Sequence, residues 1–382
     1  MINRIKIEGY KSIKKLDLEL KPINILIGSN GVGKSNFLSF FKLVNNIYEQ
    51  RLQGYVAKQG GADNLLHFGR KVTEQIKGTL YFDYKNSYVF ELFSDSENLL
   101  IISNDRGGFN SEYGTTFTYK DTWFYTYFTQ YSKESNVIKE KKGIGSWVNT
   151  YLNSFKKYHF HDTGENSPLR SSSQVDDNKY LKENGSNLPA FLYYLQEMHP
   201  KSFNRIEKTV KSIAPYFERF ELSPDRLNKN MIKLEWKEIN QPDGYFNASH
   251  LSDGTLRFIA LATLLMQPDL PEVIIIDEPE IGMSEEMVCA LGEWLVGILP
   301  ILKKHRIGLM IITHSRLLID LLYELTFVED YSFDFKNLDG LNIEEYLNRK
   351  VVKADLGLLK ANYLFYAVRE RMHEVKKSEK EK

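Results

Sequence analysis

Hydrophobic and polar residues alternate along the first part of the chain. Residues 2–7 alternate with a period of two, and residues 16–20 do the same after a turn over residues 9–12. This period places successive side chains on opposite faces of an extended strand. The pattern therefore predicts an antiparallel hairpin, and the continuous apolar run over residues 23–27 predicts a buried strand after it.

The buried run leads directly into Gly28-Ser29-Asn30-Gly31-Val32-Gly33-Lys34-Ser35. This is the spacing G-x-x-x-x-G-K-S of a phosphate-binding loop. Phe37, Leu38, Phe41 and Val44 then recur at helical spacing, so a helix leads out of the loop. A chance glycine-rich turn is the alternative, but a chance turn needs neither the strand before it nor the helix after it.

The residue types of this loop suit phosphate groups. Its glycines let backbone N–H groups converge on phosphate oxygens, and the helix N-terminus adds a positive dipole. Lys34 supplies a charge for the outer phosphates and the Ser35 hydroxyl can ligate magnesium. The loop therefore predicts ATP and Mg²⁺ as ligands. The candidate nucleotide-binding residues here are Gly28, Asn30, Gly31, Gly33, Lys34, Ser35 and Asn36, with Lys11 and Ser12 in the earlier turn.

A second candidate element is acidic and lies far downstream. Residues 273–276 form a short continuous apolar run, which is typical of a parallel strand buried on both faces, and the run ends in Asp277-Glu278-Pro279. At the strand end Asp277 would hold magnesium through water, and Glu278 would orient and deprotonate the attacking water. Alone, this would be read as an acidic turn; paired with the phosphate-binding loop, it predicts a catalytic base.

A third element, Leu251-Ser252-Asp253-Gly254-Thr255, precedes an apolar helical stretch. It resembles the signature motif of ABC ATPases, which is usually Leu-Ser-Gly-Gly-Gln. Ser252 and the backbone around Gly254 would present donors at a helix N-terminus to a γ-phosphate. An ordinary helix N-cap is the simpler alternative, and the order of the motifs along the chain favours the signature.

A fourth element is the apolar run over residues 307–312, which predicts another buried strand and ends in Thr313-His314-Ser315. A single histidine at a strand end is more often structural than catalytic. Here it follows the acidic strand by one predicted helix, and it matches the switch histidine of ABC ATPases in that position. Glu278 and His314 are therefore the candidate catalytic residues.

Taken together, these motifs resemble the RecF/SMC-like short ABC-type ATPases, a family of predicted ATPases related to the ATPase part of OLD nucleases. The resemblance covers the first fifty residues and roughly 185 to 320. The string over residues 251–258 is typical of that group, and so is the segment 158–163 ahead of Ser-Pro-Leu-Arg at 167–170. One loop departs from the family: Met283-Ser284-Glu285 stands where the group usually has Leu-His-Pro.

The resemblance implies an α/β fold, in which an ABC-type ATPase head with a mixed sheet flanked by helices carries an inserted helical and strand lobe. It implies that His314 contacts the γ-phosphate, and that Ser252 and Gly254 meet the nucleotide of a partner protomer in an ATP-dependent head-to-head homodimer. It also implies slow hydrolysis of ATP to ADP and phosphate, serving bacterial anti-phage defence or DNA maintenance beside a separate effector, a nuclease or a toxin.

The motifs also suggest how the chain is divided. We expect residues 1–78 and 236–330 to form the two parts of the head, 79–235 the inserted lobe, and 331–382 a helical extension with a charged tail. Within the lobe, residues 79–93 and 115–131 are rich in tyrosine, phenylalanine and threonine, which favours strands. Residues 132–215 read as a mostly helical lid, with a polar loop over 164–187. No long heptad array is present in the sequence.

Composition narrows the possible partners. The 50 basic and 50 acidic residues give a net charge of zero, so a chain coated in basic surface for nucleic acid is disfavoured and DNA remains only a possible partner. The single cysteine, Cys289, fits a reducing compartment, and the chain begins without a secretory signal or a membrane-length apolar run. We therefore expect a cytoplasmic protein without membrane attachment.

Two other functions remain open from the sequence. A non-hydrolysing scaffold could use ATP only to hold an assembly together, but the intact Glu278 disfavours it. The ATPase subunit of a transporter is disfavoured by the Ser-Asp-Gly-Thr signature and the long inserted lobe. A nuclease activity within the chain is also disfavoured, because the stretch after His314 is too short for the Toprim domain of OLD-type nucleases and carries no carboxylate cluster.

Overall fold

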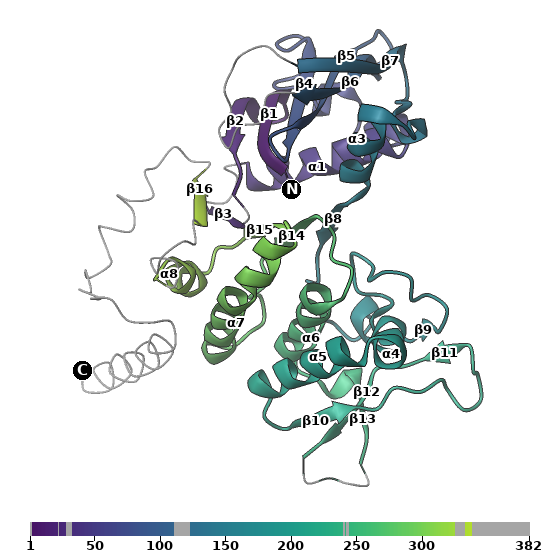
Figure 1. The fold of residues 1–382 in the computed structure, drawn as a ribbon, viewed down its shortest axis with the longest axis vertical. Coiled ribbons are helices and arrows are strands. Elements are labelled where there is room, and N and C mark those ends of the chain that lie inside the picture. Colours follow the sequence, from purple (N-terminus) through teal and green to yellow (C-terminus); the bar gives the residue numbers. More distant parts are fainter. Residues whose placement is uncertain are drawn as a thin grey trace. The chain divides into compact units, whose positions relative to one another are not determined.

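The alternation at the start of the chain builds the predicted hairpin. In the computed structural model, drawn in Figure 1, β1 (Ile2–Tyr10) pairs antiparallel with β2 (Ile13–Glu19), with Ile5 opposite Leu18. The structure describes residues 2–21, 23–27, 33–110, 123–239, 241, 244–324 and 333–337. Gly28, Asn30 and Gly31 lie outside these residues, as does the predicted charged tail.

The described chain divides into two compact units. Unit 1 comprises Met1–His159, Gln267–Asp277 and Leu302–Ile312, and unit 2 comprises Phe160–Met266, Glu278–Ile301 and Thr313–Lys382.

An antiparallel sheet forms a large part of unit 1. Among the described residues its strand order is β2-β1-β4-β5-β6-β7, so neighbouring strands are mostly joined by short turns. The aromatic and β-branched stretches predicted as strands build much of it. Its further strands are β4 (Gln75–Phe82), β5 (Asn86–Ser94), β6 (Leu100–Asn110) and β7 (Trp123–Ser132).

One face of this sheet is covered by the helix that follows the phosphate-binding loop, α1 (Lys34–Tyr48). The Phe40 ring stacks on Phe90 with centroids 5.8 Å apart, and both side chains are fully buried. Gly78 permits this approach, because a Cβ there would lie 2.3 Å from the Phe90 ring. Each buried phenylalanine contributes on the order of 2 kcal/mol. The other helices of this unit are α2 (Leu52–Lys58), α3 (Gly143–Asn153) and the 3₁₀ turns η1 (Ala62–Asn64) and η2 (Val137–Lys139).

A parallel sheet lies in the same unit. β3 (Ile23–Ile27) pairs with β15 (Gly308–Ile312), β15 with β14 (Val273–Asp277), and β14 with β8 (Phe155–Tyr158). The fully buried runs of β14 and β15 explain why their sequences are continuously apolar. β8 falls within the stretch predicted to be mostly helical; its four residues, Phe-Lys-Lys-Tyr, are too short and too charged for periodicity to reveal a strand.

Unit 2 is built mainly of helices. Figure 1 shows α5 beside α6, and the Thr209 hydroxyl at α5 lies 3.5 Å from the Met266 sulfur at the end of α6. Its helices are α4 (Leu188–Met198), α5 (Pro200–Ile213), α6 (Asp253–Met266), α7 (Glu285–Lys304, in this unit up to Ile301), α8 (Arg316–Glu324), η3 (Pro168–Arg170) and η4 (Ala248–His250).

Short strands complete unit 2. They are β10 (Phe217–Phe220), β12 (Glu235–Glu238) and β13 (Phe246–Asn247) in one small sheet, β9 (Ser173–Gln174) and β11 (Met231–Ile232) in another, and β16 (Phe333–Asn337). The stretch 164–187, predicted as a polar loop, is anchored here by the buried side chains of Leu169 and Leu181.

The architecture confirms the predicted fold class, an α/β protein with parallel and antiparallel pairing and flanking helices. No described helix is long and apolar enough to cross a membrane.

Candidate functional site

The carboxyl ends of three neighbouring parallel strands gather the predicted motifs of unit 1. Leu26 of β3 is level with Ile312 of β15, which is level with Asp277 of β14. The strands run parallel, so the phosphate-binding loop after Ile27 and the Asp277 carboxylate leave the sheet at the same edge. Ligands of open α/β sheets bind at this edge.

The start of α1 holds two of the predicted residues, Lys34 and Ser35. Gly33 adopts φ 114° at the N-cap position, no side chain caps the helix, and its first turn holds no acidic residue. The first backbone N–H groups of a helix have no partner within the helix, and its dipole favours an anion there. Lys34, in the first turn, is only 6% exposed. Ser35 is exposed at the same turn.

Ser12 packs against this helix start. Its hydroxyl accepts a 2.7 Å hydrogen bond from the Asn36 side-chain amide, and a Cβ at Gly33 would lie 3.0 Å from the same oxygen. The structure therefore brings Ser12 together with Gly33, Lys34, Ser35 and Asn36. This supports the grouping of the hairpin turn with the phosphate-binding loop.

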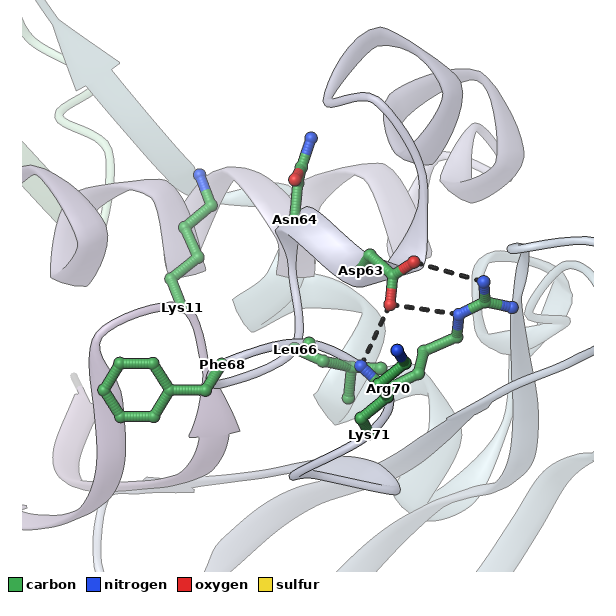
Figure 2. A pocket seen from close by; sticks show the side chains of 8 residues that line it. Lys11, Asp63, Asn64, Leu66, Phe68, Arg70 and Lys71 are labelled. Atoms are coloured by element: carbon green, nitrogen blue, oxygen red, sulfur yellow. Dashed lines mark hydrogen bonds and ion pairs between the residues drawn. The ribbon is translucent and has the colours of Figure 1, made fainter.

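Lys11 points elsewhere. Its amine donates to the Gln59 side chain at 3.1 Å, and it lines an open pocket of about 540 Å³, in which Arg70 binds the Asp63 carboxylate (Figure 2). Partial burial, and then the charge of Lys42, lower the pKa of the Lys11 amine.

The Asp277 carboxylate is paired with a residue that the sequence did not single out. Lys157, on the adjacent strand β8, places its amine 3.2 Å from Asp277. Both side chains are partly exposed, at 36% and 24%. A cation bound by Asp277 would therefore take over a charge interaction that Lys157 now supplies. Nothing in the Phe-Lys-Lys-Tyr sequence of β8 indicated that Lys157 pairs with Asp277.

In unit 2 the two predicted catalytic residues meet. The His314 imidazole nitrogen Nε2 lies 3.5 Å from Glu278 Oε1, and the two side chains are 37% and 29% exposed. Glu278 has φ 44°, in the left-handed region that non-glycine residues rarely adopt. Strained backbone of this kind persists where the surroundings hold it and clusters at functional sites.

Glu280, two residues further, joins this loop to the histidine turn. Its Oε1 accepts the Thr313 hydroxyl and, at 3.2 Å, the Ser315 backbone N–H. The residues before and after His314 are therefore both held by one carboxylate. Glu280 was not predicted as a site residue, because a second glutamate after an acidic strand looks like an ordinary polar loop.

Side chains of the signature turn in unit 2 cap the N-terminus of α6. Ser252 Oγ accepts the Thr255 backbone N–H at 3.1 Å, and Asp253 in the first turn of α6 receives a 2.7 Å hydrogen bond from Arg170. Arg170 also donates to the carbonyls of Ala248 and Leu251. Ser252 therefore has the geometry of an ordinary helix N-cap, and it remains exposed.

Gly254 and the loop after Glu278 are in contact. A Cβ at Gly254 would lie 2.9 Å from the Gly282 carbonyl oxygen and 3.2 Å from the Met283 Cα. Gly254 is therefore needed for close packing at this point. This contact also places the segment that departs from the family pattern, Met283 onward, beside the start of α6.

Arg257 joins the signature string to the segment 158–163. It is 2% exposed on α6 and donates to the carbonyls of Phe160 and His161 at 2.8 and 2.9 Å. Burial lowers the pKa of its guanidinium, which the charges of Asp253 and Glu280 partly restore. Arg170 and Arg257 lay in strings noted in the sequence, but their partners are distant along the chain.

The comparisons with known proteins agree with these motifs. A family model described as "AAA domain, putative AbiEii toxin, Type IV TA system" matches residues 23–320. No curated protein matches the chain.

Among solved structures, the chain is similar to an SMC head bound to the C-terminal winged-helix domain of ScpA, with TM-score 0.52 and 12% identity over 84% of this chain and 91% of that one. The SMC head domain from Thermotoga maritima matches with TM-score 0.37 at 13% identity, and that of Pyrococcus furiosus, with its extended coiled coil, with 0.43 at 10%, both over the same shares of each chain. The first similarity shows the fold of an SMC-type ATPase head, and the lower TM-scores add nothing to it.

Proposed function

This chain belongs to the family of AAA domains described as putative AbiEii toxin of type IV toxin–antitoxin systems, and we propose that it is an ATPase that binds Mg-ATP and hydrolyses it slowly. Lys34 and the helix start beside Ser12 bind the outer phosphates. Ser35 and Asp277 hold magnesium, and Glu278 acts as the general base. His314 contacts the γ-phosphate.

The pairing of Glu278 with His314 carries this proposal. The two residues come from motifs that follow different strands, and their side chains lie 3.5 Å apart. A carboxylate that takes a proton from water benefits from a neighbour that fixes its orientation. Turnover distinguishes this function from that of a scaffold that only binds ATP.

We propose further that ATP joins two heads about a two-fold axis. Ser252 is exposed at the N-terminus of α6, and the backbone of the buried Gly254 follows it in the first turn, where the helix dipole favours a phosphate. In such an isologous pair each Ser252 meets the nucleotide of the partner, so both composite sites form together.

The dimer is tested by mass measurement of the Glu278→Gln variant at micromolar protein. This variant binds ATP without consuming it, so it should be monomeric alone and dimeric with Mg-ATP. The Glu278→Gln, Ser252→Ala double variant is the matched control and should stay monomeric. A monomer under every condition would exclude the head-to-head dimer.

The effector is proposed to be a separate protein, a nuclease or toxin that the head regulates in anti-phage defence or DNA maintenance. The SMC head of the similar structure is bound to a domain of another protein, ScpA. Within this chain, the neighbouring carboxylates Asp176 and Asp177 are the alternative nuclease candidates, and Asp177 has a structural role, because it forms an ion pair with Lys182 and its carbonyl accepts the Asn187 side chain.

A nuclease assay tests this division of labour. Purified protein with DNA or RNA, Mg²⁺ or Mn²⁺ and ATP should leave the nucleic acid intact. Cleavage that is lost on replacing Asp176 or Asp177 by alanine would place the nuclease in this chain instead.

A further inference from the structure

We propose that Glu280 is a positioning residue, which holds the turn around His314 so that its imidazole stays beside the Glu278 carboxylate. This inference rests on the proposed ATPase function and names a residue outside its predicted machinery.

The contacts of Glu280 surround His314 on both sides. Its Oε1 accepts from the Thr313 hydroxyl and from the Ser315 backbone N–H at 3.2 Å. The Thr313 hydroxyl in turn accepts the Ser315 N–H at 3.0 Å, which closes a three-member network. Fixing the residues before and after a side chain removes most of its backbone freedom, and rotamers held in this way make a site precise.

Burial differs along the turn in the way that a positioning role requires. Thr313 is fully buried, whereas the His314 side chain is 37% exposed. The Thr313 hydroxyl that binds Glu280 is therefore shielded from competing water, while the His314 imidazole reaches outward. A hydrogen bond away from water is harder to replace, because an unmade bond leaves a desolvated group.

Glu280, which binds the residues on either side of His314, and Glu278, which lies beside its imidazole, belong to the same loop. Glu278 and Glu280 are separated by Pro279, and the loop is closed by hydrogen bonds from Ile281 N–H to the Glu278 carbonyl at 3.3 Å and from Met283 N–H to the Glu280 carbonyl at 3.0 Å. Any movement of this loop would shift the base and the histidine turn together. The separation of Glu278 and His314 is thereby kept constant.

A purely structural role is the rival explanation. Ser315 caps α8, since its hydroxyl accepts the Leu318 N–H at 3.2 Å, and a carboxylate near a helix N-terminus stabilises that helix. On this view Glu280 would matter for stability and equally for every step of the reaction. The two roles make different predictions for His314 variants.

The charge of Glu280 can be separated from its hydrogen bonds. Its second oxygen, Oε2, is buried without a hydrogen-bond partner in the described structure, and so is Nη1 of Arg257 on α6. The opposite charges attract, which favours the ionised guanidinium. Glu280→Gln keeps an acceptor for Thr313 and Ser315 and removes only the charge, whereas Glu280→Ala removes both.

The test is a double-mutant cycle on steady-state ATP hydrolysis with Glu280→Ala, His314→Ala and the combined variant. Glu280→Ala should lower kcat by about 10- to 100-fold, the usual cost of losing an orienting group, with KM unchanged. In the His314→Ala background it should have no further effect on kcat, because the group it positions is gone. Two effects that multiply in the combined variant would overturn the proposal.

Glu280→Gln provides the rescue and should retain most of the wild-type kcat, while loss equal to that of Glu280→Ala would contradict positioning through hydrogen bonds. Glu197→Ala, at an exposed glutamate of α4 in the same unit, is the matched control and should behave as wild type. If Glu280→Ala does not fold, Glu280→Asp takes its place, since a carboxylate one methylene shorter cannot hold both groups.

Hydrogen exchange of the Ser315 amide separates this proposal from the ATPase function. Without nucleotide, Glu280→Ala should speed exchange there by about fivefold or more, the equivalent of one lost hydrogen bond, and Glu280→Gln should not. If the wild-type protein did not hydrolyse ATP, the proposed function would be contradicted. The exchange rate of the Ser315 amide could still be compared between the variants, because its measurement needs no turnover. Unchanged exchange in Glu280→Ala would contradict the positioning role alone.

Discussion

The N-termini of α1 and α6 both carry a predicted phosphate contact, and they differ in how they are capped. At α1 the N-cap is Gly33, no side chain caps the helix, and the first turn holds no acid. At α6 the Ser252 hydroxyl accepts the Thr255 N–H, and Asp253 stands in the first turn with Arg170 bound to it.

The difference assigns the two termini different parts in phosphate binding. With no side-chain cap and no acid in its first turn, the positive end of the α1 dipole favours an anion. At α6 the chain's own side chains already satisfy the helix, so this terminus is stable without a ligand and exposes a serine for a partner. Substitutions at α1 should therefore change ATP affinity, and substitutions at α6 should change stability and dimerisation.

Arg170 should give the largest effect on the α6 side of this comparison. Arg170→Met removes a guanidinium whose side chain is 8% exposed, takes the Arg170 donor away from the Leu251 carbonyl, and leaves the Ala248 carbonyl with the Leu251 N–H alone. We expect a loss of about 3 kcal/mol in the free energy of unfolding, since each unsatisfied buried group costs roughly 1–3 kcal/mol. Denaturant unfolding measures it.

Arg170→Lys is the matched control for this substitution. A lysine keeps the charge but lacks the planar fork of donors, so most of the loss should remain. Wild-type stability in the lysine variant would show that charge alone holds the start of α6.

Lys34→Ala should give the largest effect on the α1 side. Removing a charged donor to the outer phosphates should weaken ATP binding by about 10- to 100-fold, from the roughly 1.5–3 kcal/mol of such a hydrogen bond. A nucleotide titration with unchanged Kd would mean that this helix start does not bind phosphate.

Ser252→Ala should have a smaller effect, divided between two measurements. Loss of the cap should cost about 1 kcal/mol of stability. ATP affinity of the monomer should stay unchanged, while the ATP-dependent dimer seen by mass should be lost. Ser249→Ala, an exposed serine three residues earlier, controls for the substitution itself. If Ser252→Ala lowered monomer affinity as Lys34→Ala does, the contrast between the termini would fail.

Lys11→Gln should give the smallest effect. Lys11 lies beside the pocket of Figure 2 and donates to Gln59, away from the Ser12 contact with α1. Its charge acts on the nucleotide only from a distance, so ATP affinity should fall slightly at low salt and return to the wild-type value at high salt. A deficit that persists at high salt would indicate direct contact.

The fold class and the positions of the motifs could be predicted from the sequence because they depend on local signals. The continuous apolar runs of β14 and β15 are buried as expected, and the apolar spacing after Ser35 builds α1. The sequence placed Asp277 and Thr313 at the ends of these runs, and the structure shows that the two strands are parallel neighbours.

Contacts between distant residues could not be predicted in this way. Lys157 is bound to Asp277 across neighbouring strands, and Arg257 is bound to the carbonyls of Phe160 and His161. The partners in each pair are far apart along the chain, so no sequence spacing or hydrophobic period indicates that they are in contact. The left-handed backbone of Glu278 and the two-sided anchor of Glu280 likewise depend on how loops meet, which a single sequence does not encode as a pattern.

The central claim, that this head hydrolyses ATP with Glu278 as base, is tested most directly by ATP turnover of wild type and Glu278→Gln alongside a nucleotide titration. The account predicts measurable wild-type turnover, a fall of about 10²- to 10⁴-fold in the variant and unchanged ATP affinity. Equal turnover in the two proteins would contradict the assignment of Glu278. ATP binding without turnover in wild type would contradict the ATPase itself and favour the scaffold.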